Sequence, residues 1–142
     1  MLTMARIKIE LPEKKIATIG IKVRITDLNY GNHLGNDALV GILHEARVEW
    51  LQQYNYTELN IEGVGLIMSD LAVEYKREAF YGDVLAVSIF VAAVSSVSFE
   101  LYYSVTNQHE NLVAKAKTGM VCYSYKQKKV TEMPMKFLDI LQ

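Results

Sequence analysis

The stretch T-D-L-N-Y-G-N-H-L-G-N-D-A-L-V-G-I-L-H-E-A-R-V-E-W, residues 26–50, runs from a loop into the longest helix that the sequence predicts. Its loop, residues 28–35, is rich in residue types that tolerate turn conformations and interrupt regular elements: Asn29, Gly31, Asn32 and Gly35. After the loop, Asn36 or Asp37 is predicted to cap the helix, because both side chains accept hydrogen bonds from free backbone N–H groups.

The helix is predicted from the spacing of its apolar residues. They recur at i, i+3, i+4, i+7 and i+11, which places them on one helical face: Leu39, Ile42, Leu43, Ala46 and Trp50. Val40 and Val48 widen this face, and a face of that breadth indicates a helix enclosed by a sheet. The helix is predicted to end near residues 54–56.

Alternating apolar and polar residues predict strands on both sides of the helix. One alternating segment precedes it, residues 19–26. The predicted strands that follow it are residues 71–76, 84–94, 97–106 and 112–125. Turn residues at 81–83 and 107–111 connect them as antiparallel neighbours, and residues 134–141 predict a short terminal helix. The expected class is α+β, and the unpaired sheet edges favour a dimer.

The composition fits one domain over residues 1–142. The formal net charge is -1, so a nucleic-acid partner is not expected, because such binding depends on a basic surface. Charged residues near the N-terminus argue against an export signal, and the most apolar run, residues 84–94, is too short to cross a membrane. The single cysteine, Cys122, suits a reducing compartment, and we expect a cytoplasmic protein with no membrane segment.

Four polar residues of the opening stretch have catalytic potential: Asp27, Asn29, His33 and Glu45. A loop histidine before a helix, with a carboxylate on that helix, can orient a water or a carbonyl group. The helix N-terminus offers free N–H groups to a developing oxyanion. The same spacing also fits a histidine that serves only the turn. The three histidines lack partners at metal-ligand spacing, so no metal site is predicted.

The segment D-L-N-Y-G-N-H-L-G-N, residues 27–36, resembles the motif of hotdog-fold thioesterases. It is similar to D-L-D-x-N-x-H-x-N-N of the acyl-ACP thioesterases and to D-x-x-G-H-x-N-N of acyl-CoA thioesterases in the hydroxybenzoyl-CoA thioesterase-like group. The resemblance continues through Y-K-R-E-A-F-Y-G-D, residues 75–83, and covers residues 16–125. It implies a hotdog fold, in which a curved antiparallel sheet of about five strands wraps a long central helix.

The resemblance also implies an activity and an assembly. The expected reaction is hydrolysis of an acyl-CoA or acyl carrier protein thioester without a cofactor, in a homodimer or homotetramer with active sites at the dimer interface. Carried over by position, His33 matches the motif histidine and Glu45 the helix carboxylate, and the backbone N–H of Asn36 would polarise the thioester carbonyl. Met68 and Ser69 match positions that would line an acyl tunnel, although plain core packing fits them equally well.

Two departures from the motif affect the mechanism. Asn29 stands where the family usually has its catalytic aspartate, and Gly31 stands where the acyl-ACP enzymes have asparagine. An amide does not act as a base or a nucleophile as a carboxylate does. We favour Glu45 as the group that activates water, with Asn29 and His33 positioning it. The alternatives are that Asp27 reaches the site, or that the protein binds acyl thioesters without cleaving them. A hotdog dehydratase ranks last, because the chain lacks the proline-glycine-rich loop around the histidine by which such enzymes resemble each other.

Overall fold

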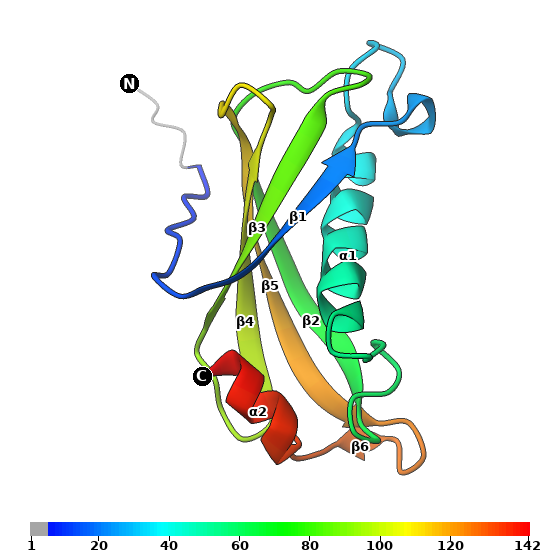
Figure 1. The fold of residues 1–142 in the computed structure, drawn as a ribbon, viewed down its shortest axis with the longest axis vertical. Coiled ribbons are helices and arrows are strands. Elements are labelled where there is room, and N and C mark those ends of the chain that lie inside the picture. Colours follow the sequence, from blue (N-terminus) through cyan, green and yellow to red (C-terminus); the bar gives the residue numbers. More distant parts are fainter. Residues whose placement is uncertain (1–5) are drawn as a thin grey trace.

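A computed structural model describes residues 6–142 as one antiparallel sheet with a long helix along one of its faces (Figure 1). The strands are β1 (Lys15–Lys22), β2 (Gly65–Tyr75), β3 (Val84–Ala92), β4 (Ser98–Thr106), β5 (Leu112–Ser124) and β6 (Lys129–Val130). The helices are α1 (Asn36–Gln52), the shorter α2 (Met135–Leu141) and a 3-10 turn, η1 (Ile25–Asp27). The predicted α+β class and antiparallel sheet are confirmed.

The strand order is β1-β3-β4-β5-β2, and the two-residue β6 pairs with β5. The path of five long strands agrees with the expected number. Strands β3, β4 and β5 are consecutive neighbours, whereas β2 joins the far side of β5, so that β1 and β2 form the two edges. The chain segment between β1 and β2 contains α1, which runs along one face of the sheet (Figure 1).

The core lies between α1 and the sheet. The predicted helical face is confirmed, because Leu39, Ile42, Leu43, Ala46 and Trp50 are each at most 3% exposed. Alternate residues of β3 and β4 meet this face, and each large side chain buried there stabilises the fold by about 1.5–3 kcal/mol. Within residues 6–142, no helix is long and apolar enough to cross a bilayer.

Several predicted boundaries are wrong, and β1 begins at Lys15 rather than at residue 19. β1 ends at Lys22 rather than at residue 26, because the Asp27 carboxylate accepts a hydrogen bond from the Arg24 N–H and closes η1. β2 begins at Gly65, well before residue 71, and an irregular register between Met68 and Asp70 hides its alternation. Finally, α1 ends at Gln52 instead of near residues 54–56.

Candidate functional site

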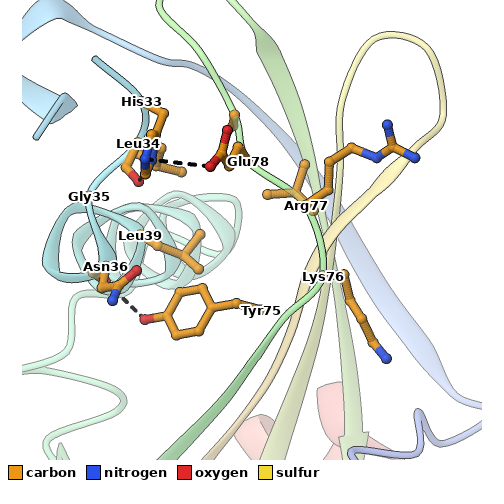
Figure 2. Close-up of a pocket in the computed structure, with 11 residues that line it drawn as sticks. His33, Leu34, Gly35, Asn36, Leu39, Tyr75, Lys76, Arg77 and Glu78 are labelled. Carbon is orange, nitrogen blue, oxygen red and sulfur yellow. Dashed lines mark hydrogen bonds and ion pairs between the residues drawn. The ribbon is translucent and has the colours of Figure 1, made fainter. Parts of the chain in front are cut away.

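A cavity of about 300 Å³ lies between the N-terminus of α1 and the segment that follows β2 (Figure 2). Its apolar walls come from Leu34, Leu39, Ala79 and Val113, and its polar groups from the loop before α1 and from residues 75–78. His33 and Asn36, two of the residues predicted from the motif, both line this cavity.

Backbone hydrogen bonds hold the loop that carries His33. The Leu34 N–H donates to the Ala79 carbonyl at 2.8 Å, and the Asn29 N–H donates to the His33 carbonyl at 2.9 Å. The first of these bonds ties the loop to the segment after β2, which is distant in sequence. His33 is therefore placed against this segment by main-chain contacts as well as by its own side chain.

Asn29 supports the turn next to His33. Its side-chain oxygen accepts a hydrogen bond of 2.8 Å from the Gly31 N–H, which is the geometry of an Asx turn. A Cβ atom at Gly31 would lie 3.2 Å from that oxygen and 3.3 Å from His33 Nε2. A side chain at position 31 would therefore press on both Asn29 and His33, which the structure brings close together.

The cavity is bordered by the N-terminus of α1. Its N-cap residue is Gly35, so the prediction of Asn36 or Asp37 at this position is wrong. Within residues 6–142, no side chain makes a capping hydrogen bond to this end of the helix. The first backbone N–H groups of a helix lack intrahelical partners and carry positive partial charge. The cavity is thus next to a helix end suited to an oxyanion.

His33 faces a carboxylate that sequence analysis missed. Its Nε2 lies 3.6 Å from Oε1 of Glu78, and both side chains project toward each other in Figure 2. Its other ring nitrogen, Nδ1, lies 3.4 Å from the Leu34 carbonyl oxygen. Glu78 belongs to the segment Y-K-R-E-A-F-Y-G-D, residues 75–83, which the family resemblance had already singled out. The spacing within that segment does not indicate that Glu78 lies near the loop before the helix.

Asp27 is buried and engaged by Arg24. Burial alone would raise the pKa of Asp27, but hydrogen bonds from the Arg24 side chain and N–H, and the guanidinium charge, outweigh it and hold that pKa below its usual value. The contacts are a backbone bond of 2.8 Å and side-chain bonds of 3.0 and 3.3 Å. Asp27 does not line the His33 cavity, and its carboxylate serves the bend after β1.

Glu45 lies on another flank of α1. It lines a second cavity, of about 560 Å³, between the helix and β1, together with Arg24, Asp27 and Glu49. Nine residues beyond Asn36, it is displaced by about 13 Å along the helix axis. A hydrogen bond with Glu45, then burial and the Glu45 charge, raises the pKa of Glu49. Within one protomer, Glu45 and His33 are not brought together.

The two predicted tunnel residues are separated as well. Met68 lines a groove of about 490 Å³ between β2 and α1, beside Val40 and His44. Ser69 lines a hollow of about 250 Å³ with Asp70 and Lys117. Neither residue lines the cavity that contains His33. Among residues 6–142, no three His, Cys, Asp or Glu side chains form a cluster able to hold a metal ion.

Comparison with known proteins gives consistent relationships. A family model described as the thioesterase-like superfamily matches residues 23–141. A 1,4-dihydroxy-2-naphthoyl-CoA hydrolase from Nostoc punctiforme is 29% identical over 110 residues, which cover 73% of this chain and 72% of that protein.

Solved structures resemble the fold closely. A 1,4-dihydroxy-2-naphthoyl-CoA thioesterase from Synechocystis has a TM-score of 0.80 at 21% identity, covering 87% of this chain and 93% of that one. A Staphylococcus aureus protein solved in complex with CoA has a TM-score of 0.81 at 14% identity, covering 94% and 85%. These likenesses confirm the predicted hotdog fold.

Proposed function

Because this chain belongs to the thioesterase-like superfamily and is a thioester hydrolase, we propose that its substrate is an acyl-CoA whose carbonyl group binds in the cavity beside His33. The observation that carries this proposal is the combination, in one cavity, of an uncapped helix N-terminus and a histidine. Attack on a thioester places negative charge on the carbonyl oxygen, and preorganised N–H donors stabilise that charge.

The carbonyl oxygen would accept hydrogen bonds at the first turn of α1, from the Asn36 N–H and its neighbours. The Asn36 carbonyl accepts a bond of 3.2 Å from the Tyr75 hydroxyl, which ties this turn to the end of β2 (Figure 2). His33 would lie beside the thioester carbon. The loop bonds described above support this assignment because they fix His33 and the helix end relative to each other.

The cavity walls suit an apolar acyl group. Leu34, Leu39 and Val113 are buried, and a volume of about 300 Å³ is at the small end of the range for ligand cavities. Lys76 and Arg77 also line the cavity, with side chains that extend away from His33 in Figure 2. These cations would meet the phosphates of CoA at the mouth.

The family motif suggests Glu45 as the base, but one protomer does not bring Glu45 to the His33 cavity. Its displacement of about 13 Å along α1 means that a thioester at the helix N-terminus would have to receive Glu45 from a second subunit. Met68 and Ser69 do not line the His33 cavity of their own protomer, so they could bind the acyl group there only from a second subunit. Within one protomer, Asn29 acts by supporting the turn beside His33.

A homodimer formed through β2 would supply the second subunit. β2 is an edge strand of 11 residues, and its exposed side chains include Met68, Leu71 and Tyr75. A long edge with apolar side chains favours pairing with another strand. Tyr75 also lines the His33 cavity, so a partner on this edge would lie beside the site. A tetramer of such dimers, a cytoplasmic location and a single domain over residues 1–142 remain predictions.

The test is to measure thiol release from a panel of acyl-CoAs and acyl carrier proteins by the purified protein. We expect release from acyl-CoAs, and His33→Ala should lower turnover by about 10²-fold or more. Gln127→Ala is the control, because Gln127 is exposed in the turn between β5 and β6, away from the cavity. If the folded protein releases no thiol from any substrate, the proposal is contradicted. If it releases thiol only from acyl carrier proteins, the substrate is an acyl carrier protein thioester and not an acyl-CoA.

A further inference from the structure

We propose that Glu78 is the carboxylate that activates the hydrolytic water, with His33 orienting it. This inference rests on the function proposed above and assigns the base of that reaction. It follows from the geometry of the cavity, where Glu78 Oε1 lies 3.6 Å from His33 Nε2 on the wall opposite the α1 loop (Figure 2).

Glu78 has a carboxylate that is free to react. Within residues 6–142, its ion pair with His33 is the one polar contact of that carboxylate. Its side chain is 62% exposed, so water reaches it. The second oxygen, Oε2, is then available to accept a proton from a water molecule in the cavity, which is the requirement for a general base.

The other carboxylates near the motif are less suitable. Asp27 is buried and binds Arg24 through both oxygens. Glu45 lies on the flank of α1 that faces β1 and does not line the His33 cavity. Asn29, at the position of the usual aspartate, is an amide whose oxygen is used by the Gly31 N–H. Glu78 would therefore supply, from a different segment, the carboxylate that the loop lacks.

His33 is suited to hold Glu78 in place. Both of its ring nitrogens face oxygen atoms that accept hydrogen bonds, the Glu78 carboxylate and the Leu34 carbonyl. An imidazole ring with acceptors on two sides is held in one orientation, and Nε2 then faces the Glu78 carboxylate.

The reaction then balances without a further reactant. Glu78 accepts a proton from water as the water oxygen forms a bond to the thioester carbon, and the carbonyl oxygen becomes an oxyanion at the α1 N-terminus. When the oxyanion collapses, the carbon–sulfur bond breaks and sulfur takes the electron pair. The proton held by Glu78 passes to the departing thiolate, and the acid leaves as a carboxylate after losing its own proton to solvent.

The experiment compares Glu78→Gln and Glu78→Asp with the unchanged protein in the thiol-release assay. Glu132→Gln is the matched control, because Glu132 is exposed and lies outside every cavity described above. We expect Glu78→Gln to lower kcat by about 10²-fold or more with KM within about twofold. Glu78→Asp should retain part of kcat, because it keeps a carboxylate.

The results separate this inference from the function on which it rests. If the unchanged protein hydrolyses acyl-CoA and Glu78→Gln retains kcat to within about threefold, Glu78 is not the base and the proposed function stands. A rise in KM with kcat unchanged would likewise overturn the assignment, because it would make Glu78 a binding residue. If the unchanged, folded protein releases no thiol, both proposals fail. Thermal melts of each variant verify that the fold is intact.

Discussion

The side-chain oxygen of Asn29 accepts a hydrogen bond of 2.8 Å from the Gly31 N–H, in the loop that positions His33. An aspartate at this position can make the same bond, because a carboxylate also accepts from a backbone N–H. Asn29 can therefore affect activity by supporting the turn beside His33, without taking part in the chemical step.

We expect Asn29→Asp to keep the fold and Asn29→Ala to destabilise it by about 0.5–1.5 kcal/mol, the usual contribution of one hydrogen bond. Urea unfolding measures the stability, and thiol release measures turnover. Turnover should fall in Asn29→Ala, because His33 is no longer held by the turn. A large gain in Asn29→Asp would instead show that the site lacks its natural base, as expected of a protein that binds acyl thioesters without cleaving them.

The Arg24–Asp27 contact should make stability depend on pH. The pKa of Asp27 is lowered in the folded state, so the contact stabilises the fold above the unfolded pKa of about 3.9, and this contribution is lost as pH falls through the folded pKa. We expect Asp27→Ala to lower the free energy of unfolding by about 1–3 kcal/mol at pH 7.

Urea unfolding at pH 7 and at successively lower pH tests this expectation. The difference between Asp27→Ala and the unchanged protein should shrink below about pH 4. Asp139→Ala, an exposed aspartate of α2, is the control and should show little difference at any pH. A difference that stays constant down to the folded pKa and below it would mean that packing, and not charge, accounts for the effect of Asp27.

The pKa of Glu49 should depend on the neighbouring Glu45. A hydrogen bond with Glu45 is the largest cause that raises the pKa of Glu49, and burial and the Glu45 charge add to it. A carboxyl with a raised folded pKa stabilises the fold below its unfolded pKa, and that contribution is lost as pH rises through the folded value.

We therefore expect Glu45→Ala to lower the pKa of Glu49 and to raise stability at pH 7 by about 0.2–0.5 kcal/mol, since like charges four residues apart on a helix repel. NMR titration of the Glu49 side-chain carboxyl follows the pKa directly. Unchanged titration of Glu49 in Glu45→Ala would show that the two carboxyls do not interact.

The β2 edge should determine the oligomeric state. Leu71 lies on this strand and is 39% exposed, and a charged residue there blocks pairing with a second strand. We expect the unchanged protein to be a dimer and Leu71→Lys to be a monomer in light scattering after size exclusion. Met135→Lys is the control, because Met135 is an exposed apolar residue of α2, away from this edge. A dimer that survives Leu71→Lys would place the interface elsewhere.

The sequence alone determined the main elements of the fold, because these depend on local periodicity. The apolar spacing of Leu39, Leu43 and Trp50 predicts a helical face whatever packs on it, and the alternation in β3, β4 and β5 predicts a meander. The start of β2 was missed because an irregular register there breaks the alternation. The cap of α1 was missed because glycine caps by its backbone conformation and leaves no side-chain signal.

The candidate site likewise contains residues that local sequence predicts and residues that only the tertiary structure brings together. The motif placed His33 and Asn36 together because they are neighbours in one loop, and local sequence determines such proximity. Only the tertiary structure decided which carboxylate faces His33, because β2 folds back beside the helix N-terminus and brings Glu78 there, while the helical rise carries Glu45 away. The approach of segments distant in the chain depends on packing, which no local pattern contains.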